Sequence, residues 1–216
     1  MARVPVAVLV SGSGTNMVAL ARAAAGSDHP ARIVAVRSDV AGAPALDRAR
    51  ELGLDAAAVP FDRADRPAWE SRLAADVAAT GAEVVVLAGF MRVLSAAFLA
   101  RWPDRVVNVH PSLLPAFPGA HAVADALAAG VRVTGVTVHL VDEQVDHGPI
   151  LAQAAVEVRP DDDTAALHAR LQPLEHRLLP ACVAALCEGR VDVVRGHAVV
   201  RPAVQVTIPA VPEVLP

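Results

Sequence analysis

The stretch Val4-Pro-Val-Ala-Val-Leu-Val10 runs directly into Ser11-Gly-Ser-Gly-Thr-Asn16, and together they decide the fold class. The first seven residues form a continuous apolar run, which is typical of a β-strand buried on both faces of a sheet. The glycines then let the chain turn, and residues 17–25 are predicted to be helical. A strand, a tight turn and a helix in this order favour a parallel α/β sheet.

The rest of the first half repeats this strand–helix unit. We expect strands at 32–36, 56–59, 83–87 and 106–109, and helices at 43–52, 67–80 and 95–101. Repeated units of this kind predict an α/β, Rossmann-like fold, in which a mostly parallel sheet has helices on both faces.

The second half changes character. After a short helix at 121–129, alternating residues predict one long strand at 131–141 and another at 150–158, and the loop between them is too long for a tight hairpin. We therefore expect antiparallel strands to extend the sheet. A long helix ending near 188 contains Pro173 and Pro180, where we expect a kink or a break, and a short hairpin follows at 191–200.

Composition excludes several classes of protein. The 216 residues are 54% hydrophobic and 19% charged, which argues against disorder. A net charge of −4 gives no basic surplus for nucleic acid, and no apolar run reaches the roughly 18 residues of a membrane-spanning helix. The N-terminus, with Arg3 and Pro5, does not resemble a signal peptide. Cys182 and Cys187 alone cannot form a disulfide framework, so we expect a reduced, cytoplasmic protein without nucleic-acid or membrane partners.

Missing residue types narrow the chemistry further. The sequence contains no Lys, which excludes lysine Schiff-base chemistry and a Walker A site. The eight His residues form no H-E-x-x-H pattern, so we expect no metal site. Only two Asn residues occur, Asn16 and Asn108, which makes their positions a weak clue to the site.

The turn at residues 11–16 is the first candidate binding site. Glycine lets several backbone N–H groups converge, and the N-terminus of the following helix adds positive potential, so this turn favours a phosphate. The spacing departs from G-x-G-x-x-G, because Met17 stands where the third glycine would be. The alternative is an ordinary strand-to-helix turn in which Thr15 or Asn16 caps the helix.

A second candidate is Asn108-Val-His110-Pro-Ser112, at the carboxyl end of a buried strand. Strand alternation places Asn108 and His110 on the same side, and ligands of open α/β sheets bind at such ends. An amide beside an imidazole suits acyl chemistry, since one group can stabilise an oxyanion and the other can move protons. The alternative is a core histidine bonded to backbone, with the asparagine as a turn former.

The third candidate is the acidic segment Asp142-Glu-Gln-Val-Asp146-His-Gly-Pro149. Its spacing does not fit a calcium-binding EF-hand loop. It could be a solvated acidic turn. The functional alternative is that a carboxylate from this segment reaches His110 and keeps the imidazole protonated.

At these residues the chain resembles phosphoribosylglycinamide formyltransferases, the folate-dependent formyltransferases of purine synthesis. The resemblance extends from about Val6 to Arg190. It rests on seven ordered segments, which are 11–16, 85–95, 108–115, 117–121, 135–139, 146–149 and 172–176.

The resemblance implies transfer of a formyl group from 10-formyltetrahydrofolate to the amine of 5-phosphoribosylglycinamide through a tetrahedral intermediate. It makes Asn108 the amide that stabilises the oxyanion, His110 the general acid and Asp146 the carboxylate that keeps His110 protonated. The implied positions for binding phosphoribosylglycinamide are Gly14, Thr15 and Asn16 for the phosphate and Glu175 for the ribose. The implied folate-binding positions are Arg66, Met91, Arg92, Val93, Leu94, Asn108, Asp142, Glu143, Gln144, Val145 and Asp146.

The same resemblance predicts the organisation of the chain. We expect a single formyltransferase domain at 1–201, with a phosphate-binding half at 1–110 and a folate-binding and catalytic half at 111–201. Residues 202–216 are predicted to be a proline-rich tail. The predicted partners are small-molecule substrates, with formyl-folate as co-substrate and no metal, in a monomer or a homodimer.

Two departures and three rivals accompany the resemblance. His147 stands where the family usually has a small residue, and Arg37-Ser-Asp39 replaces a commoner Ser-Asn at a strand end. A formyl-folate hydrolase shares the Asn-His-Asp core, but it normally carries an extra N-terminal regulatory domain. A methionyl-tRNA formyltransferase would need a further basic domain. A non-catalytic nucleotide-binding module would need the phosphate turn without the other two motifs.

Overall fold

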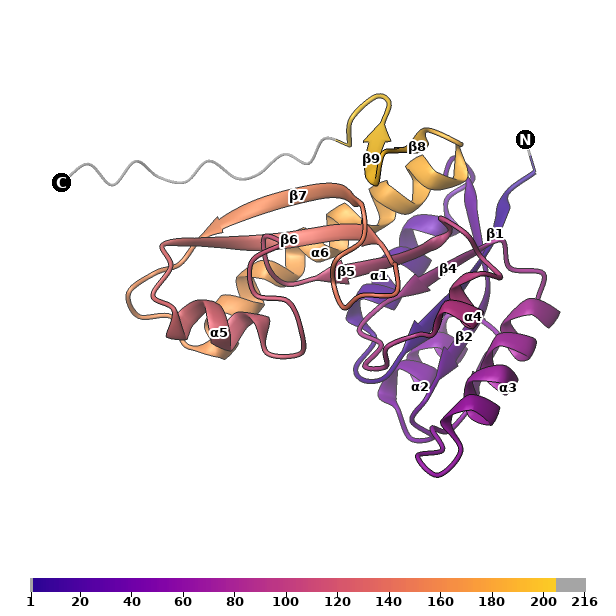
Figure 1. The fold of residues 1–216 in the computed structure, drawn as a ribbon. Coiled ribbons are helices and arrows are strands. Elements are labelled where there is room, and N and C mark those ends of the chain that lie inside the picture. Colours follow the sequence, from indigo (N-terminus) through magenta and orange to yellow (C-terminus); the bar gives the residue numbers. More distant parts are fainter. Residues whose placement is uncertain (1, 205–216) are drawn as a thin grey trace.

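The computed structural model describes residues 2–204, and Figure 1 shows a central sheet with helices packed against it. Seven strands lie in the order β3-β2-β1-β4-β5-β6-β7. The strands from β3 to β5 are parallel, and β6 and β7 run antiparallel to their neighbours. Their bounds are β1 Val4–Val10, β2 Ala31–Ser38, β3 Ala56–Ala58, β4 Val84–Leu87, β5 Val106–His110, β6 Val133–Leu140 and β7 Ile150–Glu157. The mostly parallel α/β sheet with an antiparallel extension is thereby confirmed.

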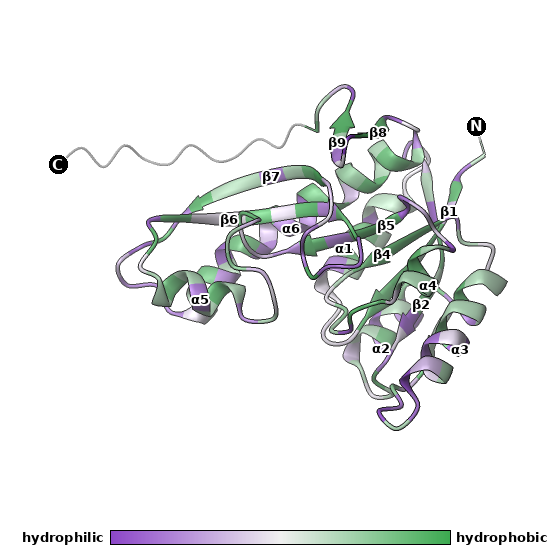
Figure 2. Cartoon of the chain, in the orientation of Figure 1, coloured by the Kyte–Doolittle hydropathy of each residue, from purple (hydrophilic) through white to green (hydrophobic). Residues whose placement is uncertain are grey.

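Alternation along β1 divides the core into two layers. The side chains of Val6 and Val8 pack on one face of the sheet with the buried faces of α1 and α6, while those of Ala7 and Leu9 pack on the other face with α3 and α4. Figure 2 shows the hydrophobic character of these central strands. The helices are α1 Thr15–Ala25, α2 Pro44–Glu51, α3 Arg66–Ala79, α4 Ala96–Leu99, α5 Ala122–Ala128 and α6 Thr164–Cys187.

The C-terminal helix differs from expectation. Helix α6 continues through Pro173 and Pro180, so of the two expected outcomes, a kink or a break, the break is not present. A proline removes one helical hydrogen bond, but α6 buries a stripe of leucines that includes Leu167, Leu171 and Leu178 against the sheet. Burial of each such side chain is worth roughly 1.5–3 kcal/mol, which compensates for the lost bonds.

Up to residue 204, the C-terminal part of the chain has the structure predicted from the sequence. The predicted terminal hairpin is formed by β8 (Val191–Val194) and β9 (His197–Val200). Of the predicted tail, residues 205–216 lie outside the described residues. None of the helices within residues 2–204 has the length and apolar character that a bilayer span requires.

The strand order determines where a ligand can bind. After β1 the chain moves to β2 on one side, and it later returns to β4 on the other side of β1. The loops that leave the carboxyl ends of β1 and β4 therefore separate, and such a switch point opens a crevice in α/β sheets. The turn at 11–16 and the segment at 88–94 border this crevice, and β5 supplies its third side.

Candidate active site

Strands β5 and β6 bring a polar cluster together. Asn108 and His110 lie two residues apart on β5, so their side chains point to the same side of the sheet. The antiparallel register places His139 of β6 directly opposite Asn108. The amide nitrogen of Asn108 lies 3.2 Å from Nε2 of His139. His139 was not predicted as a site residue, because its position depends on how two strands pair.

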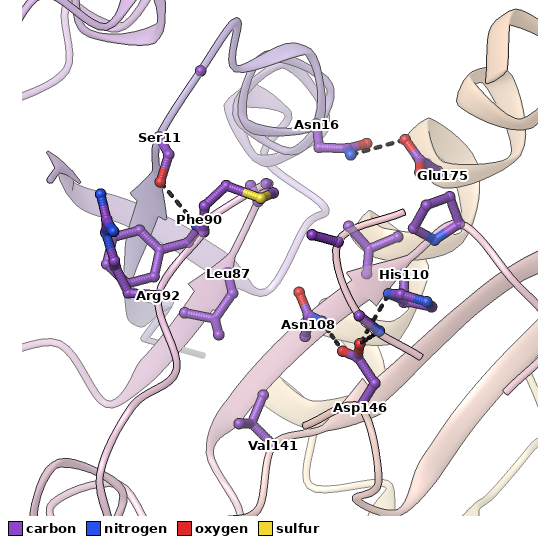
Figure 3. Close-up of a pocket in the computed structure, with 18 of the residues that line it drawn as sticks. Ser11, Asn16, Leu87, Phe90, Arg92, Asn108, His110, Val141, Asp146 and Glu175 are labelled. Carbon is purple, nitrogen blue, oxygen red and sulfur yellow. Dashed lines mark hydrogen bonds and ion pairs between the residues drawn. The ribbon is translucent and has the colours of Figure 1, made fainter. Parts of the chain in front are cut away.

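The third member, Asp146, reaches the cluster from the loop between β6 and β7. Its Oδ2 atom lies 3.3 Å from Nδ1 of His110, and its Oδ1 atom accepts a hydrogen bond of 3.3 Å from the Asn108 amide. The backbone N–H of Gly119 donates to Oδ2 at 2.7 Å. Figure 3 shows these side chains converging. The structure therefore joins the three predicted catalytic residues in one hydrogen-bonded group.

Electrostatics keep Asp146 ionised. Burial by itself would raise the pKa of this carboxyl, whose side chain is 11% exposed. The hydrogen bonds from His139 and Gly119 and the charges of His110 and His139 outweigh that effect, and the pKa of Asp146 falls below its ordinary value of 3.8. The carboxylate is therefore charged at neutral pH and available to an imidazolium.

Both ring nitrogens of His110 face oxygen atoms. Nε2 lies 2.9 Å from the carbonyl oxygen of Phe117, and Nδ1 faces the Asp146 carboxylate. Both oxygens can only accept hydrogen bonds when Asp146 is ionised. The ring is therefore fixed in orientation between the loop that carries Phe117 and the Asp146 carboxylate.

The loop that carries Asp146 is held by a close backbone approach. A Cβ atom at Gly148 would lie 2.0 Å from the carbonyl oxygen of Leu140, so only glycine fits there. Asp146 itself has a φ of 51°. At the start of the loop, Asp142 pairs with Nδ1 of His147 at 2.7 Å. The unusual His147 therefore closes the exposed edge of the loop and does not enter the catalytic cluster.

The turn at residues 11–16, where a phosphate is predicted to bind, depends on Gly14 for its backbone conformation. Gly14 has a φ of 75° and precedes the first residue of α1. A Cβ atom there would lie 2.5 Å from Cβ of Ala45, which makes glycine necessary. The first N–H groups of a helix have no helical partner, and at this turn they border the pocket. Gly14, Thr15 and Asn16 thus offer backbone donors to an anion.

The side chains beside the turn are engaged with α6. The Asn16 amide donates to Oε2 of Glu175 at 3.0 Å, and Gln172 donates to the Thr15 hydroxyl at 3.2 Å. The Asn16 side chain is therefore directed to Glu175, and its contact with a phosphate stays a prediction. Glu175 is 4% exposed, and its burial outweighs the Asn16 hydrogen bond and the charge of His168, so its pKa rises above the ordinary value.

One pocket of about 500 Å³ joins these groups. The predicted residues that line it are Gly14, Thr15, Asn16, Met91, Arg92, Val93, Leu94, Asn108, His110, Gln144, Val145, Asp146 and Glu175. Further lining residues that were not predicted as site residues include Leu87, Phe90, Gly119, Val141, His139, His168 and Gln172. Met91, Val93 and Val145 are between 49% and 63% exposed, so the outer part of the pocket is apolar.

Three residues that were predicted to bind folate do not line the pocket. Arg66, at the start of α3, donates from Nη2 to the carbonyl oxygen of Val93 at 2.6 Å, which places it behind the outer part of the pocket. Asp142 faces His147, and Glu143 is exposed to solvent. These three stay predictions for ligand contact.

Within residues 2–204, no group of three or more His, Cys, Asp or Glu side chains is placed to hold a metal ion. The two cysteines lie in α6, where burial raises the pKa of each thiol to about 12. Neither cysteine therefore supplies a thiolate at neutral pH.

Fold and site define an α/β formyl transferase: residues 4–183 match the family described as formyl transferase. The chain belongs to this family, in the branch of the phosphoribosylglycinamide formyltransferases. It is 50% identical over 192 residues to the phosphoribosylglycinamide formyltransferase of Mycobacterium tuberculosis, covering 87% of this chain and 86% of that protein. It is 38% identical to the Escherichia coli protein of the same name, covering 86% and 88% of the two chains.

Solved structures agree with these relatives. The glycinamide ribonucleotide transformylase 1 of Symbiobacterium toebii superposes with a TM-score of 0.88 at 41% identity, over 92% of this chain and 94% of that chain. A formyltetrahydrofolate deformylase from Pseudomonas syringae superposes with a TM-score of 0.86 at 27% identity, over 92% of this chain and 66% of that chain. The fold is therefore common to enzymes named for transfer and for removal of a formyl group.

Proposed function

We propose that this protein transfers the formyl group of 10-formyltetrahydrofolate to the amine of 5-phosphoribosylglycinamide, a step of purine biosynthesis. The observation that carries the proposal is the contact of Asn108, His110 and Asp146 in one pocket, between an anion-binding turn and an apolar outer part. The names of the relatives at 38–50% identity support the same substrates.

The pocket offers a separate place to each substrate. A phosphate fits the backbone N–H groups at residues 14–16, and a ribose hydroxyl fits the carboxyl of Glu175 beside them. The flat rings of the folate can stack against the exposed apolar side chains of Met91, Val93 and Val145. The catalytic cluster on β5 lies between these two places, where the amine and the formyl group must meet.

The reaction follows from the protonation states of the cluster. The amine nitrogen attacks the formyl carbon, a C–N bond forms, and the carbonyl oxygen becomes an oxyanion. His110 lines the pocket and faces the Asp146 carboxylate, so it is placed to act on this oxygen as the general acid. The attacking nitrogen then releases a proton, the carbonyl re-forms as the bond from the formyl carbon to N10 of the folate breaks, and His110 gives N10 a proton and is reprotonated by the one released.

Asn108 supplies the second donor to the oxyanion. Its amide N–H groups lie 3.2 Å and 3.3 Å from their partners, near the long end of hydrogen-bond distances, so an oxyanion can compete for one of them. Asn108 lines the pocket, so its amide is accessible to a bound substrate. The exchange of a weak bond for a charge-assisted bond favours the transition state.

The cofactor and cellular setting follow from this chemistry. We propose that His110 and Asn108 polarise the formyl oxygen, so that no metal ion is needed. The co-substrate is 10-formyltetrahydrofolate, the partners are small molecules, and the enzyme acts in the cytoplasm as a monomer or a homodimer. One domain over residues 1–201 would contain every group named above.

A formyl-folate hydrolase is the second candidate, because the deformylase from Pseudomonas syringae has the same fold. In that reaction water would attack the formyl carbon in place of the amine. Purified protein is mixed with 10-formyltetrahydrofolate in the presence and absence of phosphoribosylglycinamide, and loss of the formyl group is followed. Transfer predicts loss only with phosphoribosylglycinamide present. Equal loss without it, with release of formate, would establish the hydrolase instead.

A further inference from the structure

Asp39 lies behind the pocket and takes no part in the chemistry described above. It follows the last residue of β2, and its side chain is 0% exposed. The carboxylate accepts a hydrogen bond of 2.6 Å from the hydroxyl of Ser11 and another of 2.6 Å from Nε of Arg92. A buried carboxylate is costly unless it is bonded in this way, so the two contacts are needed for its burial.

Ser11 connects two pocket segments. Its hydroxyl donates to Asp39 and accepts the backbone N–H of Met91 at 2.8 Å. Its own N–H donates to the carbonyl oxygen of Gly89 at 3.1 Å. Figure 3 shows Ser11 at the end of β1 with a dashed bond to the neighbouring segment that carries Phe90. The start of the phosphate turn is thus fastened directly to residues 89–91.

Arg92 is held on the opposite side of the same carboxylate. Its guanidinium lies 4.0 Å above the centre of the Phe61 ring, and the backbone N–H of Phe61 donates to the carbonyl oxygen of Asp39 at 2.8 Å. The charged group is therefore clamped between a carboxylate and an aromatic face. This clamp fixes the backbone from Met91 to Leu94, which forms part of the outer pocket.

We propose that Asp39 is a positioning residue that holds the phosphate turn and the segment 91–94 at a fixed separation. The inference rests on the proposed function, in which these two segments bind the two substrates. The amine and the formyl carbon must lie about 3–3.5 Å apart before they react, so small changes in this separation affect the rate. A carboxylate suits the position because it accepts from both Ser11 and Arg92, whereas an amide would direct N–H groups at one of them.

The Asp39→Asn variant tests the two contacts separately. The amide oxygen can still accept from Ser11, but the charge that holds Arg92 is gone. We expect the KM for formyl-folate to rise roughly tenfold, as for loss of one hydrogen bond to a charged group, while the KM for phosphoribosylglycinamide changes less than threefold. Ser11→Ala removes the contact to Asp39 and the acceptor of Met91 N–H, and both KM values should rise.

Asp76→Asn is the matched control. Asp76 forms an ion pair with Arg37, a buried arginine that also pairs with Asp55 at 2.8 Å. None of these three residues belongs to the phosphate turn or to the segment 89–94. The same loss of one carboxylate charge should leave both KM values unchanged. Thermal unfolding of all variants reports the accompanying change in stability.

The results separate positioning from a purely structural role. A destabilised enzyme loses active molecules, so its apparent kcat falls with KM unchanged. That pattern in Asp39→Asn and Ser11→Ala would overturn the inference, and Ser11→Ala alone decides if Asp39→Asn does not fold. Calorimetric titration with tetrahydrofolate gives the same comparison as a Kd. If the wild-type protein binds tetrahydrofolate but transfers no formyl group, the proposed function fails while the Kd values still test Asp39.

Discussion

Replacement of Asp146 by Asn removes the charge that faces His110. The carboxylate and the ring nitrogen lie 3.3 Å apart, and their side chains are 11% and 6% exposed. At an effective dielectric constant of about 20, two opposite charges at this distance attract each other by about 5 kcal/mol. The cost of burying both charges offsets part of that attraction. The remaining part is the stabilisation of a positively charged His110 ring that Asp146→Asn would remove.

The expected result is a large loss of activity at neutral pH. General acid catalysis contributes about 10²–10⁴-fold to a rate, so kcat of Asp146→Asn should fall by roughly 10³-fold. The amide would also have one acceptor oxygen in place of two, so it could not accept both on the side of His110 and on the side of Asn108. The exposed Asp47, which pairs with Arg50 at the surface, provides the control Asp47→Asn, whose activity should equal that of the wild type.

The pH profile follows from the sign of the Asp146 shift. A carboxyl whose pKa is depressed contributes above its ordinary value of 3.8 and loses that contribution as pH falls through the lowered pKa. The wild-type carboxylate is therefore charged throughout pH 5–8 (roughly the working range of the assay), and the difference between the two proteins should persist across it. Its contribution to folding stability has the same sign and is lost only in stronger acid.

Steady-state rates of formyl transfer measure the loss, and NMR of the His110 ring nitrogens measures its cause. The ring-nitrogen signals of His110 should differ between the wild type and Asp146→Asn, because Nδ1 loses the charged acceptor that it faces. Activity of Asp146→Asn within threefold of the wild type would refute the role of this ion pair. So would an unchanged ring spectrum, because the geometry makes Asp146 the acceptor for Nδ1.

Three further results are expected. Gly14→Ala should destabilise the fold by about 1–3 kcal/mol and raise the KM for phosphoribosylglycinamide, because the added Cβ would clash with Ala45. Gly81 has a φ of 73° and no atom within 4 Å of an added Cβ, so Gly81→Ala should lose less stability in denaturant unfolding and leave the KM unchanged. Glu175→Gln should raise the melting temperature at pH 7. A carboxyl with a raised pKa favours folding below its ordinary value of 4.5 and loses that contribution as pH rises through the raised pKa, so the gain in melting temperature should vanish in acid. The same change should weaken ribose binding. Exhaustive chelation should leave the rate of formyl transfer unchanged, and a large loss that zinc restores would contradict catalysis without metal.

Local patterns in the sequence were enough for most of the fold. The apolar run at 4–10 and its glycine turn predicted β1 and the start of α1, because a buried parallel strand and a helix N-terminus both leave short-range signals. Burial of α6 was not a local signal, so the two prolines predicted a kink or a break, and no break occurs. Packing against the sheet, which involves residues more than a hundred positions away, decided that helix.

The candidate site divides in the same way. Strand alternation alone put Asn108 and His110 on one side of β5, since a period of two residues is a property of the chain itself. The partner of that pair depended on tertiary structure: strand register brought His139 opposite Asn108, and a loop closed by Gly148 brought Asp146 to both.

Contacts between distant segments could be decided only by the folded chain. Asn16 meets Glu175 across 159 positions, and Ser11 meets Asp39 and Met91 across 28 and 80. No periodicity relates such residues, because their distances depend on the order of strands in the sheet and on the helices that cover it. The sequence by itself therefore determined which chemical groups stand at the strand ends, and the tertiary structure determined which of them touch.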